Sequence, residues 1–381
     1  MMVGKTQSFA REFNNHLVLE ALEKKPMSAT ELSSCFHLSN ATLSSVLKSL
    51  TSMGLIEPVG LDSVSGSGRK RVQYALSSQF GTILVVDFGS EKYHARLYDL
   101  PGNILFEEEN QLERYDVAHI EPIVASIQKG ISNIEMPVRY TVLCLPGLVS
   151  TQSGELQSSS RFDSALFSPK NKLQNLFSEA FSCPVKLEND TKIMMSGELA
   201  QGRFEGVDSG LLAFVDYGIG GAFEFQGSCF RGGRGYSGEI GRVLISGSNG
   251  EVTNLDDAAS IRAIKDRIQA QTGERPHTKE IVERFHRGDA FIRDLVLISA
   301  EKLGEGLRLI HSVMDLERIV VSGRVSLFGK EYLTRVQQSF GEGPTICYGA
   351  SCEDALFYGA KKLGLSYLWN NVPKSSPAKE E

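Results

Sequence analysis

The first 78 residues contain three successive stretches in which apolar residues recur at helical spacing. An apolar stripe over residues 17–22 predicts a first helix that ends before Pro26. Ser28 and Glu31 have the spacing of a capping box, so we expect a second helix to begin at Ser28. Ser39 is positioned to cap a third helix, whose apolar positions are Leu43, Val46, Leu47 and Leu50.

The third predicted helix carries short polar side chains opposite its apolar stripe. Such side chains at a helix start can reach phosphates and base edges in a major groove. The candidate DNA-binding residues on this helix are Ser39, Asn40, Ala41, Thr42, Ser44, Ser45 and Lys48. The segments 54–60 and 71–76 can pair as a hairpin, and its Gly/Ser-rich tip ends in Arg69, Lys70 and Arg71, which suits a wing on DNA. Residues 1–78 are therefore predicted to form a winged helix-turn-helix that binds double-stranded DNA; the alternative is a three-helix protein-interaction module with a basic loop.

The remainder of the chain contains one strand–turn–strand pattern twice. Residues 84–99 (LVVDFGSEKYHARLYD) and residues 211–228 (LLAFVDYGIGGAFEFQGS) each consist of an apolar strand, an Asp, an aromatic residue, a Gly and a second strand. Helical stretches lie between the two copies. This repetition predicts a duplicated α/β fold with a cleft between two lobes, of the actin/hexokinase-like (ribonuclease H-like) ATPase type.

These patterns divide the chain into four parts. Residues 1–78 form the head, and residues 79–198 with a C-terminal helix over 352–370 form the first lobe. Residues 199–351 form the second lobe, with effector-site and dimerisation elements. The charged segment 371–381 is predicted to be a disordered tail.

Composition places the chain among ordinary globular proteins, with 41% hydrophobic and 23% charged residues. Neither an apolar run of about 18 residues nor the apolar region of a signal peptide is present in the sequence, so we expect a cytoplasmic protein without a membrane partner. The six cysteines are scattered, which favours reduced thiols over a Cys-based zinc cluster. The net charge is −6, but the first 76 residues contain eight Lys or Arg against six Asp or Glu, so the head is weakly basic.

The order of motifs along the whole chain resembles the ROK family. After the head and the Asp hairpin come LPGLV, END, GIGG, GEIG and LDDAAS. That family comprises sugar-responsive repressors and sugar kinases, and the kinases usually lack the DNA-binding head. The resemblance implies a homodimeric or larger regulator, a repressor of carbohydrate-metabolism genes controlled by a sugar or phosphosugar bound between the lobes. The alternatives are an ATP-dependent kinase of a hexose or N-acetylhexosamine that retains the head, and a regulator that senses a protein partner.

The resemblance also assigns roles to individual residues. Asn189 and Asp190 match a pair in which the Asp is the catalytic base of the kinases, although by itself the pattern favours Asp190 as the cap of the helix 191–200. Glu239 matches a residue on a sugar hydroxyl, and Asp256 stands where the family has a sugar-binding Glu. Arg242 stands where the family has a His that contacts the sugar and often binds zinc.

Arg242 admits two hypotheses. A guanidinium can read a carboxylate or phosphate, which would indicate an anionic effector. It can equally pair with Glu239 or Asp256 and stiffen the loop in place of a metal. Residues 243–254 contain neither thiol nor imidazole. We therefore expect the zinc site of the ROK family to be lost in this chain, and no metal is predicted.

The predicted phosphate loops depart from those of the family's kinases. Asp87 and Gly89 remain in the first loop, but Ser90 and Glu91 replace a Gly and a Thr. A carboxylate about 4 Å from a phosphate charge costs roughly 4 kcal/mol at an effective dielectric constant near 20. The second loop keeps Gly218, Gly220 and Gly221, whereas Arg324 follows Gly323 at the expected nucleotide end. We therefore expect neither ATP with magnesium as a cofactor nor catalysis.

Overall fold

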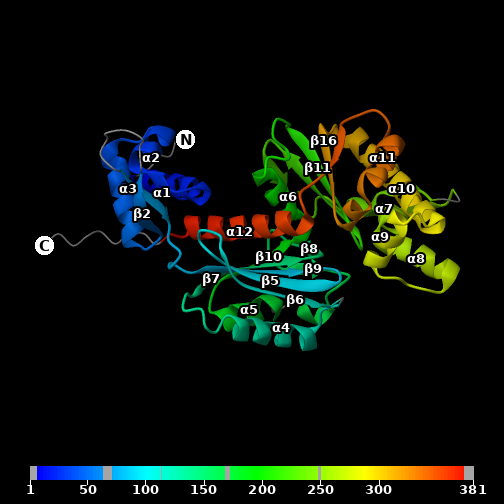
Figure 1. Cartoon of the computed structure of the whole chain (residues 1–381), viewed down its shortest axis with the longest axis horizontal. Coiled ribbons are helices and arrows are strands. Elements are labelled where there is room, and N and C mark those ends of the chain that lie inside the picture. Colours follow the sequence, from blue (N-terminus) through cyan, green and yellow to red (C-terminus); the bar gives the residue numbers. More distant parts are fainter. Residues whose placement is uncertain (1–6, 63–70, 113, 168–171, 248–249, 373–381) are drawn as a thin grey trace.

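The computed structural model describes the chain except for residues 1–6, 63–70, 113, 168–171, 248–249 and 373–381 (Figure 1). Two predictions fall partly on these segments. Arg69 and Lys70 of the expected wing lie outside the described residues, and so does all of the expected tail beyond residue 372.

The head consists of three helices and a small antiparallel sheet (Figure 1). The helices are α1 (Gln7–Lys24), α2 (Ala29–Phe36) and α3 (Asn40–Ser52), and the strands β1 (Met27–Ser28), β2 (Ile56–Asp62) and β3 (Arg71–Leu76) pair in the order β1-β3-β2. The predicted capping box is confirmed, because the Ser28 N–H donates to Glu31 Oε2 at 2.7 Å and the Ser28 side chain accepts from the Glu31 N–H. Ser39 caps α3 by accepting from the Thr42 N–H at 3.1 Å.

The body contains two five-stranded sheets with the same topology. The first is ordered β10-β7-β4-β5-β6, with β4 (Thr82–Phe88), β5 (Lys92–Asp99), β6 (Ile104–Gln111), β7 (Val138–Leu145) and β10 (Val185–Asn189). The second is ordered β13-β12-β11-β16-β17, with β11 (Ser209–Val215), β12 (Ile219–Phe225), β13 (Ser228–Phe230), β16 (Arg318–Ser322) and β17 (Thr345–Tyr348). In each sheet the three strands that come first along the chain (β4–β6 or β11–β13) pair antiparallel. The two later strands (β7 and β10, or β16 and β17) add in parallel. The predicted duplication is confirmed.

Helices cover the sheets and carry the connections. Beside the first sheet lie α4 (Val117–Gly130), α5 (Lys172–Phe181), α6 (Asp190–Ala200) and α12 (Cys352–Asn370). The second lobe contains α7 (Leu255–Ala259), α8 (Ile261–Thr272), α9 (Thr278–His286), α10 (Ala290–Met314) and α11 (Gly329–Phe340). Short elements complete the described chain: β8 (Leu148–Val149), β9 (Leu156–Ser158), β14 (Leu244–Ser246), β15 (Val252–Asn254) and the 3-10 turns η1 (Ser164–Leu166), η2 (Ile240–Arg242) and η3 (Arg324–Phe328). In the described part of the chain, no helix is long and apolar enough to cross a membrane.

Helix α12 connects the lobes to the head (Figure 1). It packs on β4, β7 and α6 and reaches α1, and one continuous apolar cluster includes Leu32 of the head, Val85 of β4 and Phe357 of α12. At the α6–α12 crossing the backbones touch, since a Cβ at Gly359 would lie 2.1 Å from the Ile193 carbonyl oxygen. The head is therefore packed against the body through a helix whose backbone is in direct contact with α6.

Candidate functional site

The predicted sugar-binding pair lies at the junction of β10 and α6. Asn189 caps α6, because its Oδ1 accepts from the Lys192 N–H at 3.1 Å, and its Nδ2 donates to the Gly147 carbonyl at 3.0 Å. Asp190 is the first residue of the helix, and its Oδ1 accepts from the Thr191 N–H at 2.6 Å. The interpretation of Asp190 as the helix cap was wrong: the cap is Asn189, one residue earlier.

Two carboxylates near this junction, those of Asp190 and Asp87, have raised pKa values. Burial raises the pKa of Asp190 to about 6, and the negative charge of Asp216 adds to the effect, while hydrogen bonds from Thr191 oppose it. Burial followed by the charge of Asp190 holds the pKa of Asp87 well above its usual range. A carboxylate with a pKa near neutrality can accept a proton from a hydroxyl group, which is the property required of a general base.

The loop from residue 231 to residue 242 is anchored to the same junction. Lys192 is buried and its Nζ donates to the Gly235 carbonyl at 2.6 Å, while Arg231 pairs with buried Glu188 at 2.5 Å. Burial lowers the pKa of Lys192. These three side chains were not predicted from the sequence, where their only signal is that they flank the Asn-Asp pair and the GEIG motif.

The residues predicted to contact sugar beside this loop have protein partners. Arg242 Nε lies 3.3 Å from Glu239 Oε2, and the Arg242 side chain is 71% exposed. Asp256 instead accepts from the Ile219 N–H at 2.6 Å and from Arg262 at 2.8 Å. The Arg242–Glu239 contact is the one expected if the arginine stiffens the loop, and the hypothesis of an anionic effector stays a prediction.

Two glycines of the second loop pack against Asp256 and against Thr191, the neighbour of Asp190. A Cβ at Gly218 would lie 3.2 Å from Asp256 Oδ1, and one at Gly220 would lie 2.9 Å from Thr191 Oγ1. These glycines therefore allow β12 to approach the first turns of α6 and α7. These contacts by themselves account for a glycine at positions 218 and 220.

Six polar residues form what we call the inter-lobe cluster: Ser90, Glu91, Asp216, Lys265, Thr278 and Arg324. Arg324 Nε lies 3.0 Å and 2.9 Å from the two carboxylate oxygens of Asp216, and Arg324 also donates to Ser90 Oγ at 2.7 Å. Glu91 pairs with Arg324 and accepts from Lys265 Nζ at 2.9 Å. Burial alone would raise the pKa of Asp216, but the Arg324 guanidinium holds it below its ordinary value.

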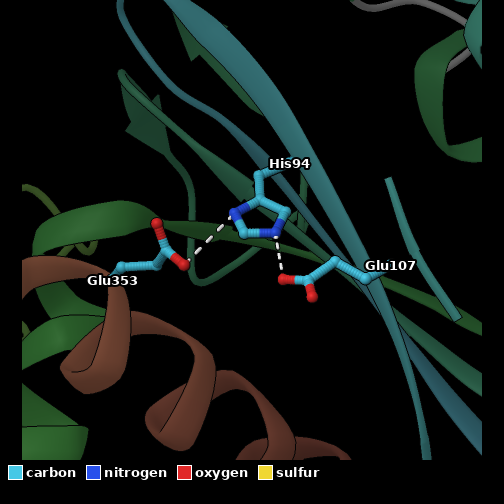
Figure 2. A group of neighbouring side chains, drawn as sticks. All are labelled: His94, Glu107 and Glu353. Carbon is cyan, nitrogen blue, oxygen red and sulfur yellow. Dashed lines mark hydrogen bonds and ion pairs between the residues drawn. The ribbon is translucent and has the colours of Figure 1, made fainter. Parts of the chain in front are cut away.

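A second charged cluster holds the start of α12 against β5 and β6 (Figure 2). His94 is 3% exposed, with Nε2 2.8 Å from Glu107 and Nδ1 3.6 Å from Glu353. Among the described residues these three side chains are the group close enough to bind a metal ion. However, the two carboxylates face different ring nitrogens, and Arg96 bonds to both Glu107 and Glu353. Because a cation already links the carboxylates, this cluster is an ion-pair network that anchors α12.

The predicted DNA-binding face of α3 is open to solvent. Its candidate residues are all exposed except Thr42, which is half-buried and bonded to Ser39. Lys48 is exposed one turn beyond Ser44 and Ser45. The opposite side of α3, with Leu43, Leu47 and Leu50, is buried in the head.

The chain combines a head of three helices with a duplicated, two-lobed α/β body, and known proteins resemble it in sequence and in fold. The ROK family model matches residues 83–345, so this chain belongs to the ROK family. The xylose repressor of Caldicellulosiruptor bescii is 25% identical over 364 residues, covering 86% of this chain and 87% of that protein.

Solved structures share the fold over different lengths. The crystal structure of a ROK family transcriptional regulator, a homologue of the E. coli MLC protein, matches with a TM-score of 0.76 at 20% identity, covering 95% of this chain and 97% of that chain. A ROK family glucokinase from Streptomyces griseus, in complex with glucose and AMPPNP, matches with a TM-score of 0.62 at 22% identity. The match covers 74% of this chain and 99% of that kinase.

Proposed function

We propose that this chain is a sugar-responsive transcriptional repressor of carbohydrate-metabolism genes. The observation that carries the proposal is the extent of the matches. The match to the regulator covers 95% of this chain, whereas the match to the glucokinase covers 74%. The xylose repressor is matched over 86% of this chain.

The head is proposed to be a winged helix-turn-helix with α3 as the recognition helix. Its exposed polar face suits a major groove, and the β2–β3 hairpin would be the wing. Two-fold symmetric operators are read by dimers, so we propose a homodimer or a larger homo-oligomer on DNA.

The effector is proposed to bind between lobes of the actin/hexokinase-like type. The proposed sugar contacts are Asn189, Asp190, Glu239, Arg242 and Asp256. Their hydroxyl-binding chemistry is supported by the carboxylate of Asp190, held at a helix start, and by the half-exposed carboxylate of Glu239. A sugar that favours one lobe arrangement would shift the equilibrium of the attached head.

The route from sugar to DNA is proposed to run through α6 and α12. Asp190 begins α6, α6 packs backbone-to-backbone on α12, and α12 packs on α1 of the head. A displacement of α6 would be transmitted because helices in direct backbone contact cannot slide past each other without separating.

We further propose that the chain has no enzymatic activity and that it uses neither ATP nor a metal. Ser90, Glu91 and Arg324 contribute side chains where a kinase would need open backbone for phosphate. A sugar kinase is the second candidate, because Asp190 keeps the position and the raised pKa of a general base.

A binding experiment tests the proposal directly. DNA fragments selected from a random pool by the full chain are titrated by fluorescence anisotropy, with and without a panel of sugars and phosphosugars. We expect one effector to change the DNA affinity, and Arg242→Ala to lower the affinity for phosphosugars only if the effector is anionic. A DNA affinity that no sugar changes would contradict a sugar-responsive repressor.

An ADP-release assay addresses the kinase candidate. Hexoses and N-acetylhexosamines are supplied with Mg-ATP, and wild type is compared with Asp190→Asn. We expect no turnover by either. Turnover by wild type that Asp190→Asn abolishes would establish the kinase and overturn the non-enzymatic assignment.

A further inference from the structure

The Glu91 carboxylate belongs to the first lobe but is bound by side chains of the second. Its Oε1 accepts from Lys265 Nζ at 2.9 Å and from Thr278 Oγ1 at 3.1 Å, and its Oε2 pairs with Arg324. Lys265 is 5% exposed and Thr278 is 3% exposed. Donors from α8, from the start of α9 and from η3 thus converge on one carboxylate that the β4–β5 turn extends toward the second lobe.

This donor set is one that proteins use to hold oxyanions. An ammonium, a guanidinium and a hydroxyl provide the charge-assisted hydrogen bonds that a phosphate group would accept. In this chain, Glu91 supplies the oxyanion itself. Glu91 lies in the turn that, in a kinase-type loop, would hold a phosphate through backbone N–H groups.

Charge compensation stabilises the partly buried inter-lobe cluster. Glu91 and Asp216 oppose Lys265 and Arg324, so the inter-lobe cluster carries two negative and two positive side chains. Burial would raise the pKa of Glu91, but the hydrogen bond from Lys265 and the charge of Arg324 hold it below its ordinary value. Glu91 is therefore ionised at neutral pH.

We propose that Glu91 is a built-in ligand whose carboxylate occupies the oxyanion donors of the second lobe and so holds the two lobes together without a nucleotide. The inference goes beyond the proposed function, because it concerns the contact between the lobes and not the binding of sugar or DNA. It would apply to a sensor or to a kinase alike.

The inter-lobe cluster is also connected to α12. Arg324 follows Gly323, whose N–H donates to the sulfur of Cys352 at 2.9 Å. Cys352 is the first residue of α12, and that helix runs from this point to the head (Figure 1). Loss of the Glu91 contact would therefore loosen the lobes at the end of the helix that supports the head.

The test compares the full-length wild type with Glu91→Gln, which keeps the size of the side chain but removes its charge. Small-angle X-ray scattering reports the radius of gyration, and hydrogen exchange reports the β4–β5 turn. We expect Glu91→Gln to have a larger radius and about tenfold faster exchange in the turn, within the range for contacting charge pairs. Glu331→Gln is the matched control, because Glu331 pairs with Arg293 inside the second lobe, and it should change neither quantity.

A milder variant keeps the test decisive if Glu91→Gln folds poorly. Lys265→Met removes one donor and leaves Arg324 and Thr278 on Glu91. Lys265→Met should accelerate hydrogen exchange in the same turn. In the double variant with Glu91→Gln and Lys265→Met, the acceleration should be smaller than the product of the accelerations in the two single variants. Wild-type exchange and radius in both single variants, or effects that simply multiply, would overturn the proposal.

Binding of inorganic phosphate tests whether the donors around Glu91 can hold an oxyanion. Glu91→Ala leaves Lys265 and Thr278 without a carboxylate and leaves Arg324 with Asp216 alone, so millimolar phosphate should slow exchange around Thr278 in this variant. In wild type the donors are occupied, and chloride at equal ionic strength serves as the control. An equal response to phosphate in wild type and Glu91→Ala would show that Glu91 does not occupy an oxyanion site.

Discussion

The α6–α12 crossing offers the sharpest test of how the body is connected to the head. A Cβ at Gly359 would lie 2.1 Å from the Ile193 carbonyl oxygen and 3.0 Å from the Gly197 nitrogen. Ordinary contact begins at 3.4 Å, so Gly359→Ala requires the helices to separate by about 1.3 Å, the difference between these distances. Both obstacles are backbone atoms, which cannot rotate away as a side chain could.

The expected cost follows from two opposing terms. Overpacking costs about 1–3 kcal/mol, and a collision with backbone belongs at the upper end of that range. Ala in a helix is favoured over Gly by about 1 kcal/mol, which offsets part of the collision. We therefore expect Gly359→Ala to lower the free energy of unfolding by about 2 kcal/mol, measured by urea denaturation.

The same variant should also weaken communication between sugar and DNA. Neither the proposed sugar contacts nor α3 is touched, so separate affinities for sugar and for DNA should stay near wild type while the effect of sugar on DNA affinity falls. Gly233→Ala is the control, because nothing lies within 4 Å of a Cβ there, and it should change stability by less than about 0.5 kcal/mol. Wild-type stability and wild-type coupling in Gly359→Ala would refute the argument that the two helices move as one unit.

Three further predictions concern single side chains. The pKa of Asp190 is raised from 3.8 to about 6, so the folded chain binds this proton more tightly than the unfolded chain, and stability should fall as pH rises through that window. Asp190→Asn should therefore raise the free energy of unfolding by about 1–3 kcal/mol near neutral pH, and an unchanged pH slope in urea denaturation would contradict this. Lys48→Ala should weaken DNA binding for all sequences alike and reduce the salt slope of log K by about 1, as measured by anisotropy; loss of binding to one base sequence only would argue for base readout instead. Ser28→Ala removes the capping box of α2 and should lower stability by about 1 kcal/mol by thermal denaturation, whereas no loss would mean that Glu31 alone sustains the helix start.

Much of the architecture could be read from local patterns. The boundaries of α2 and α3 follow from Ser28 with Glu31 and from Ser39, because capping depends on residues within one helical turn. The duplication was visible because each lobe begins with the same strand–turn–strand pattern, and the two sheets indeed share one topology. The polar face of α3 was also predictable, since helical spacing alone separates it from Leu43 and Leu47.

The candidate site was only partly predictable. Asp190 and Asn189 were recognised as a pair, but which of them caps α6 depended on where the helix begins, a boundary that the pattern does not define to one residue. Arg242 had two possible carboxylate partners in the sequence, and the fold brought Glu239 within reach while Arg262 and the backbone of Ile219 took Asp256.

The sequence by itself determined the helices of the head, the repeated hairpins and the presence of Ser90 and Glu91 in the first loop, because each depends on neighbours along the chain. Only the tertiary structure decided what these two side chains contact. Glu91 lies 174 residues from Lys265, and Ser90 lies 234 residues from Arg324, yet the folded chain brings both pairs into contact. From the sequence, the negative charge of Glu91 predicts only repulsion of a phosphate. Its cationic partners are known only from the folded chain, because electrostatic pairing depends on distance in space and not along the chain.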